Sequence, residues 1–150
     1  MAATGKDKVE RWFYIFFDDT GAAARNLTAD LVPGTCSGGG LIFDEVEMTG
    51  VSDAVKNYLA GHANSEVTAQ FYMNDTATTG SLTVLKGMHG AVGTLTLQWG
   101  GGGVPAADDP EWEGEYLLAA AGIVLAGNKH VISCRFVPSG STAPAWGVVV

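Results

Sequence analysis

The sequence predicts a mainly β protein, an antiparallel β-sandwich or barrel-like domain with one short flanking α-helix and a long loop between two strands. Three segments, 66–73, 94–99 and 128–136, alternate apolar and polar side chains with a period of two. That period turns one side of each strand toward a core and the other toward solvent or a partner. The chain also has 21 glycines, about twice the usual fraction, clustered where turns are expected.

The N-terminal part is predicted to hold a strongly β-prone strand over 9–17, followed by a turn at 18–21. The strand carries aromatic side chains on both faces, namely Trp12, Phe13, Tyr14, Phe16 and Phe17. We therefore expect both faces to be covered, one by the core and the other by a neighbouring subunit. A second short strand is expected within 25–31, followed by a Pro/Gly/Ser-rich loop over 32–40. For the chain as a whole, we expect a flexible arm over 1–8, one β domain over 9–138 and a C-terminal tail over 139–150.

The middle of the chain is predicted to contain a strand over 41–49 and two helical signals. In the strand, Glu45 and Glu47 share one face, and Ile42, Val46 and Met48 share the other. After it, Ser52 has the character of a helix N-cap and Gly61 that of a stop, so this stretch is either one or two helical turns or an ordered loop.

A better helix is expected over 82–88, capped by Ser81. The Gly-rich loop 100–110 separates the strand at 94–99 from the last two predicted strands, 111–120 and 128–137.

Three glutamates, Glu111, Glu113 and Glu115, share one face of a predicted strand. Their attachment points lie about 7 Å apart, because a strand rises about 3.3 Å per residue. A fold gains no stability from a row of like charges. The row is either a solvated acidic face or a surface whose task is to be negative, and the stacking on shared strand faces favours the second interpretation.

Composition excludes several classes of protein. With a net charge of −8 and a pI of about 4.6, the chain lacks the Lys and Arg with which proteins grip nucleic acid, but it fits a protein that lets DNA pass without sticking. No segment reaches the about 18 apolar residues of a membrane span. Residues 1–10 lack a signal-peptide core, so we expect synthesis in a reducing cytoplasm.

No catalytic, metal or cofactor site is expected. The cysteines Cys36 and Cys134 have no metal or redox spacing, and Cys134 is expected to be a buried free thiol. The histidines are scattered, and no phosphate-binding glycine motif or nucleophile elbow occurs. Paired glutamates on facing strands would suit a glycosidase, but Trp112 and Tyr116 lie on the opposite face from them, which argues against an enzyme.

The order of these segments resembles that of the tail tube (major tail) proteins of long-tailed bacteriophages with flexible, non-contractile tails. The similarity rests on Asp-Asp-Thr-Gly at 18–21, Arg-Asn-Leu-Thr-Ala-Asp at 25–30, the helix at 83–88 and Trp-Glu-Gly-Glu-Tyr-Leu-Leu at 112–118, and it covers residues 10–140. The resemblance implies a structural virion protein that forms hexameric rings, which stack into a hollow tube through which the genome passes. It also implies an acidic lumen and a long loop, here about 47–64, that reaches the next ring.

We assign residues to these roles as follows. The lumen would be lined by Glu45, Glu47, Glu111, Glu113 and Glu115, and the inter-ring loop would contact its neighbour through Val51, Val55, Tyr58 and Leu59. The apolar strand and the apolar C-terminal end would form the subunit interface through Trp12, Tyr14, Phe16, Val148, Val149 and Val150. The implied partners are the tape-measure protein and viral DNA inside the tube, and tail terminator and distal tail proteins at its ends. The subunits would be made in the host cytoplasm and would become part of the phage tail, and no membrane partner is expected.

Two alternatives stay open from the sequence. A capsid decoration or head–tail joining protein would also be small and β-rich, but it would not polymerise without a capsid. An acidic glycosidase-like enzyme would show hydrolysis and a deep cleft.

Overall fold

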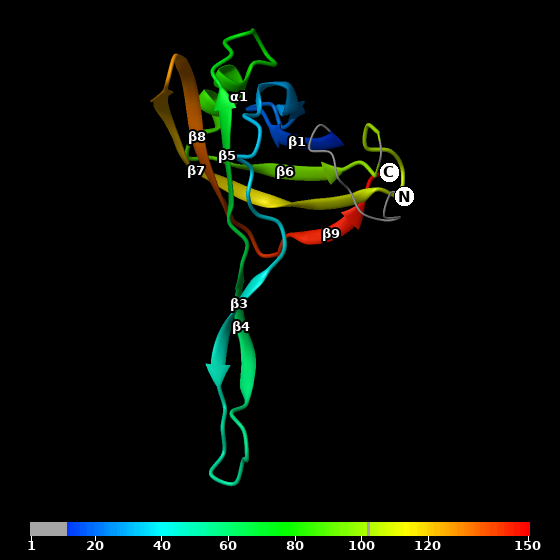
Figure 1. Ribbon diagram of the computed structural model, residues 1–150, viewed down its shortest axis with the longest axis vertical. Coiled ribbons are helices and arrows are strands. Elements are labelled where there is room, and N and C mark those ends of the chain that lie inside the picture. The colour runs from blue at the N-terminus through cyan, green and yellow to red at the C-terminus, as the bar shows by residue number, and fades with distance from the viewer. Residues whose placement is uncertain (1–11, 102) are drawn as a thin grey trace.

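The computed structural model describes residues 12–101 and 103–150. The described chain is mainly β, with antiparallel strands and one short α-helix, which confirms the predicted mainly β class with a single short helix (Figure 1). The elements are, in order, β1 (Phe13–Asp18), β2 (Ala24–Asn26), the 3-10 turn η2 (Thr28–Asp30), β3 (Ile42–Glu47), β4 (Tyr58–Asn64), β5 (Val67–Tyr72), α1 (Ser81–Met88), β6 (Val92–Trp99), β7 (Pro110–Ala126), β8 (Lys129–Pro138) and β9 (Ala145–Val148).

Seven strands form one sheet in the order β2-β1-β6-β7-β8-β5, with β9 paired to β7. The 17-residue β7 pairs with β6 along one edge, and with β9 and then β8 along the other. A bulge between Leu118 and Ala120 interrupts its pairing with β8. In Figure 1, β5 and β8 run along the length of the molecule while β1 and β6 run across it. The core is therefore enclosed by one strongly bent sheet.

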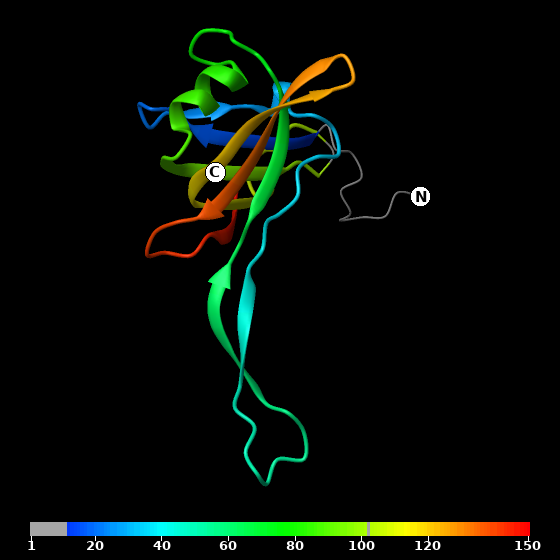
Figure 2. The ribbon, with the colours of Figure 1, turned by 90° about the vertical axis from the view of Figure 1, so that its left-hand side faces the viewer.

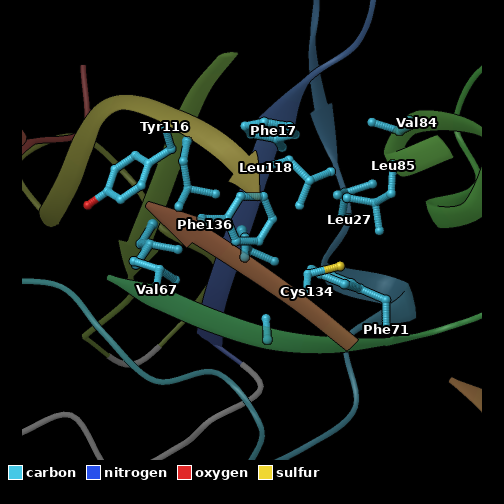
Figure 3. Packing of buried hydrophobic residues seen from close by; sticks show 14 of the residues in the cluster. Phe17, Leu27, Val67, Phe71, Val84, Leu85, Tyr116, Leu118, Cys134 and Phe136 are labelled. Carbon is cyan, nitrogen blue, oxygen red and sulfur yellow. The ribbon is translucent and has the colours of Figure 1, made fainter. Parts of the chain in front are cut away.

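The core follows the predicted alternation. The inward residues of the 66–73, 94–99 and 128–136 segments are buried except Trp99, which is half-buried. The helix adds Met88 together with Val84 and Leu85, the latter two labelled in Figure 3. Phe17 of β1 meets Phe136 of β8 edge-on, with ring centroids 5.0 Å apart. Val131, expected on the solvent side of its strand, is also buried.

Within the subunit, the described part of the N-terminal strand has one buried face, and the covering of the other face by a neighbouring subunit stays a prediction. Phe13, Ile15 and Phe17 are buried, while Tyr14 and Phe16 between them are half-buried; positions 9–11 of the expected strand lie outside the described residues. The strand expected within 25–31 is shorter than predicted. It ends at Asn26, and the chain then turns through η2.

The loop at 31–40 runs beside the outer edge of β5. Ser37 and Thr68 exchange two backbone hydrogen bonds of 2.8 Å, and the Val32 N–H donates to the Gln70 carbonyl at 2.9 Å. Gly38 follows with φ of +133°, and a Cβ there would lie 2.6 Å from the Glu66 carbonyl oxygen. Only glycine combines this φ with such a close approach.

The helix begins one residue earlier than expected, because Ser81 is its first residue and Gly80 occupies the N-cap position. The Ser81 hydroxyl donates to the Tyr72 carbonyl at 2.6 Å and accepts from the Asn74 N–H at 3.2 Å. The carboxylate of Asp30, from η2, accepts the Ser81 N–H at 3.2 Å. A side chain distant in sequence thus takes the role that a capping residue usually plays.

The helical signal after Ser52 is wrong: the segment is the tip and second strand of a β-hairpin. Val46 pairs with Leu59 and Glu47 with Tyr58, and residues 48–57 connect the two strands. Cross-strand side-chain pairs decide the outcome over a weak local helical preference. We call β3, the connection 48–57 and β4 the hairpin; it projects from the body in both views (Figures 1 and 2).

The C-terminal part contains more strand than expected. β7 continues to Ala126, because Gly127, with φ of +64°, and Asn128 make the two-residue connection to β8. The segment 139–150, expected to be a tail, contributes β9, in which Trp146 pairs with Trp112.

A hydrogen-bonded pair of hydroxyls joins the base of the hairpin to the sheet. The phenol oxygen of Tyr116, a fully buried residue, accepts the Trp112 indole N–H at 2.9 Å and lies 2.9 Å from the hydroxyl oxygen of Ser65, which is also buried. Ser65 directly follows β4. The position of the hairpin base therefore depends on one buried phenol.

We expect Tyr116→Phe to lower the free energy of unfolding by about 1–3 kcal/mol, because the Trp112 and Ser65 polar groups would lose a buried partner. Tyr72→Phe is the matched control, since the Tyr72 hydroxyl accepts only an exposed bond from Lys129, at 3.3 Å. Urea unfolding of both variants measures the difference. Equal effects of the two substitutions would show that the buried pair does not stabilise the fold.

Candidate functional site

The outward side of β1, β6 and β7 forms a continuous surface, which we call the acidic face. Direct cross-strand pairing aligns Tyr14 with Gln98 and Phe16 with Thr96. On the same side, Gln98, Thr96 and Thr94 of β6 each pair with a glutamate of β7. The face comprises Tyr14, Phe16, Asp18, Thr94, Thr96, Gln98, Glu111, Glu113 and Glu115. These nine side chains include four carboxylates and no basic group, so the surface is negative.

Each glutamate of this face accepts a hydrogen bond from the residue opposite it on β6. Gln98 donates its side-chain N–H to Glu111 at 2.7 Å. The hydroxyl of Thr96 donates to Glu113 at 3.1 Å, and that of Thr94 donates to Glu115 at 2.7 Å. The carboxylates therefore lie over β6 along the sheet instead of extending freely into solvent. Sequence reasoning found the glutamates and missed this row of donors, although the signal was present in the Thr-x-Thr-x-Gln spacing.

The other two glutamates assigned to the lumen lie elsewhere. Glu45 and Glu47 belong to β3 of the hairpin, away from the acidic face (Figure 1). Glu47 accepts the Thr49 hydroxyl at 3.0 Å and lies 3.8 Å from the Lys56 ammonium. The five predicted lumen residues thus fall on two separate surfaces.

The hairpin exposes apolar side chains on both of its faces. Val51 and Val55 are exposed to 109% and 70%, and Tyr58 and Leu59 to 50% and 58%. Every residue of β3 is exposed. A two-stranded ribbon without a covering layer is at best marginally stable in water, so these side chains indicate a surface that a partner covers.

The hairpin turn is nevertheless well organised. The carboxylate of Asp53 accepts the Gly50 N–H at 2.6 Å and the Asn57 side-chain N–H at 2.9 Å. These bonds, the Gly50 one foremost, hold the pKa of Asp53 below its usual value. Asn57 in turn donates its backbone N–H to the Thr49 hydroxyl at 3.1 Å.

The residues assigned to a subunit interface lie at two places on the sheet. Trp12, Tyr14 and Phe16 are half-buried on and just before β1, while Val148 and Val150 are exposed at the C-terminal end. Val149 is held through backbone bonds to Asp109 (2.9 Å) and Asp108 (3.0 Å).

Trp146 was missed by the sequence analysis. It is 59% exposed and packs against Trp99 in a tilted arrangement and against Trp112 edge-on, at centroid distances of 5.3 and 5.1 Å. The apolar residues Trp146 and Val148 are spaced by two, a pattern that could have indicated a strand in the segment expected to be a tail.

No metal-binding cluster of three His, Cys, Asp or Glu side chains occurs in the described part of the chain. Burial raises the pKa of the Cys134 thiol to about 12, which keeps it protonated and unreactive at neutral pH. Within residues 12–101 and 103–150, no helix is long and apolar enough to cross a membrane.

Solved structures with a similar fold come from a gene transfer agent particle and from a prophage baseplate. A chain in the tail of an empty GTA particle, refined with helical and C6 symmetry, matches with a TM-score of 0.67 and 13% identity, over 95% of this chain and 99% of that one. A chain in the virion of the native gene transfer agent (GTA) particle matches with a TM-score of 0.68 and 13% identity, over 94% and 99%. A chain in the six-fold symmetrised baseplate of the anti-feeding prophage (AFP) matches with a TM-score of 0.60 and 12% identity, over 97% and 98%.

No protein-family model and no curated protein matches the sequence. At these identities the structural matches establish a shared fold that extends over nearly the whole of each chain.

We expect the triple variant Glu111→Gln, Glu113→Gln, Glu115→Gln to be more stable than the native protein at low salt, by a few tenths to about 1 kcal/mol. The substitution removes like-charge repulsion and keeps an acceptor for each donor on β6. The gain should disappear near about 1 M salt, where charges are screened within about 3 Å. Thermal unfolding at both salt concentrations measures it, with Asp75→Asn as a control for loss of an isolated charge. Destabilisation at both concentrations would contradict the interpretation.

Proposed function

We propose that this protein is a subunit of a phage-type tail tube, in which six copies form a ring and rings stack into a hollow tube that conducts DNA. The observation that carries the proposal is the hairpin, whose exposed apolar side chains require a partner that one subunit does not provide. The similarity of the whole fold to chains in a C6-symmetric tail and a six-fold baseplate supports six copies as the ring.

The acidic face supports the assignment of a lumen. In a tube that contains DNA, a wall of carboxylates repels phosphates and prevents adhesion. Because the Debye length is about 8 Å at physiological salt, the repulsion acts on DNA near the wall. We propose that Glu111, Glu113 and Glu115 line the lumen, and that Glu45 and Glu47 act in contacts made by the hairpin.

The hairpin is proposed to join successive rings through Val51, Val55, Tyr58 and Leu59. Trp12, Tyr14 and Phe16 on one side and the 148–150 end on the other are proposed to contact neighbours within a ring. Tyr14 and Phe16 belong to the β1 part of the acidic face, so in this proposal the lumen is lined by the glutamates of β7 and the β1 part meets the adjacent subunit. In this role the subunit would surround a tape-measure protein and DNA, and would meet terminator and distal tail proteins at the tube ends. The flexible, non-contractile type of tail remains a prediction from the sequence resemblance.

The function is tested by shortening the hairpin. Glu45 and Ala60 are paired across β3 and β4, so an Asn-Gly turn can replace residues 46–59 without changing the register. We expect a variant with unchanged thermal stability that forms rings but no tubes in negative-stain microscopy, whereas the native protein forms both. Tubes of normal length from the shortened variant would show that the hairpin does not join rings, and a native protein that stays monomeric at high concentration would refute the function.

The lumen assignment is tested by reversing charge on the acidic face. We expect Glu111→Lys, Glu113→Lys, Glu115→Lys tubes to bind DNA with an affinity that falls steeply with salt, because each phosphate contact releases counterions. DNA binding to native and variant tubes is measured by co-sedimentation across a salt series, and the triple Gln variant separates loss of negative charge from gain of positive charge. A map of the tube that places these side chains on the outer wall would contradict the assignment regardless of DNA binding.

A further inference from the structure

Exposed apolar side chains gather at the two opposite ends of the subunit. Of the 16 large apolar residues that are exposed among the described residues, eight lie on the hairpin and three lie on β7 just before its turn into β8. These three, Ile123, Val124 and Leu125, are exposed to 62%, 46% and 69%. Both views place this turn, α1 and the loop 73–80 at the end away from the hairpin tip (Figures 1 and 2). We call them the receiving end.

The two ends also differ in charge. The hairpin holds Asp44, Glu45, Glu47 and Asp53 against a single cation, Lys56. The receiving end holds Lys86 on α1 and Lys129 at the start of β8, together with Asp75. The hairpin is therefore net acidic, whereas the receiving end exposes two cations, Lys86 and Lys129.

Among the described residues, Lys86 and Lys129 are the Lys and Arg side chains that form no ion pair with a carboxylate. Five Lys and Arg residues lie in the described part of the chain, and three of them, Arg25, Lys56 and Arg135, form ion pairs with carboxylates. Lys86 and Lys129 do not; Lys129 contacts the Tyr72 hydroxyl and ring.

Nearby carboxylates are already engaged within the subunit. Asp18 accepts the Thr94 N–H at 3.0 Å, and Asp30 accepts the Asn74 side-chain N–H at 3.0 Å. Asp19 pairs with Arg25 at 2.6 Å. These acids are thus less available than Lys86 and Lys129 for contacts with another molecule.

The receiving end also offers backbone hydrogen-bonding groups. β6 pairs with β7 only over 111–117, and Leu118 exchanges hydrogen bonds with Gly90 (2.9 Å) and Ala91 (3.1 Å). Beyond Leu118, no segment of the described chain pairs with this edge of β7. An added strand can pair with such an edge.

We propose that the hairpin of one subunit docks on the receiving end of a second copy of this chain, with its apolar side chains against Ile123, Val124 and Leu125 and its acidic side chains near Lys86 and Lys129. The inference rests on the proposed function and names the surface to which the hairpin binds. The two surfaces are different, so the contact repeats in one direction and builds an open filament. With six copies in a ring, six such contacts act together at each ring junction.

A reciprocal charge reversal tests the docking. Lys129→Glu should place a carboxylate against an acidic hairpin. The double variant Glu45→Lys, Glu47→Lys, which changes the formal charge of the hairpin from −3 to +1, should place cations against Lys86 and Lys129. We expect each variant alone to form rings and to lose at least about tenfold in the fraction of subunits that sediment as tubes, because like charges at an interface oppose association. An equimolar mixture of the two variants, folded separately, should form tubes again, because rings of one kind then meet rings of the other with opposite charges. Ala106→Glu with Ala107→Glu, in an exposed loop away from both ends, changes the net charge as much as Lys129→Glu and should leave tube formation unchanged.

The outcomes separate the two proposals. If the native protein forms no rings or tubes, the tube function is refuted and the docking with it. If native tubes form but Lys129→Glu elongates as well as the Ala106/Ala107 control, the function stands and the docking is refuted. Failure of the mixture to recover tubes would equally refute the pairing of these two surfaces, whereas recovery supports it.

Discussion

The pairing of β7 along both of its edges determines where the other parts of the subunit lie. Its first half joins β6 and β9, and its second half leaves β6 and continues beside β8. The bulge between Leu118 and Ala120 lies near the change of partner, and bulges increase local bend and twist. Because β8 and β5 follow the second half, they cross over β1 and β6 and close the core between them (Figure 3). The same strand carries the three glutamates on its outward side and Trp112, Tyr116 and Leu118 on its inward side.

This arrangement separates stability from assembly. The inward side chains of the bent sheet are buried without help from another molecule, and within the described residues no buried side-chain nitrogen or oxygen lacks a hydrogen-bond partner. The hairpin adds little to that core. The Ser65–Tyr116–Trp112 hydrogen bonds attach its base to the sheet, and the rest of the hairpin projects away from the core. A subunit built in this way is expected to fold first and to bury its remaining apolar surface afterwards, when other copies are present.

Period-two alternation predicted the core strands well, because a strand that is buried on one side only has apolar and polar residues in alternation. It identified the inward faces of β5, β6 and β8 and the shared face of Glu111, Glu113 and Glu115. The hairpin was misread, because neither of its faces is buried in the subunit and so its residues show no simple polar and apolar sides. The sequence pattern also could not show that Glu45 and Glu47 lie far from the other three glutamates. Their position depends on the direction in which the hairpin projects, which the local alternation of residues does not encode. The β9 strand escaped notice because it is short and its side chains are exposed.

The loop at 31–40 has a consequence for aggregation of the subunit. A bare sheet edge is a template on which any extended chain can add, and such addition leads to aggregation. Here the backbone bonds of Val32 and Ser37 occupy the outer edge of β5, and Gly38 lets the loop approach that closely. The edge is thereby closed by the subunit's own chain. In the proposed tube, this closure would prevent strand addition at β5 and so restrict the ways in which subunits can join before they reach a growing end.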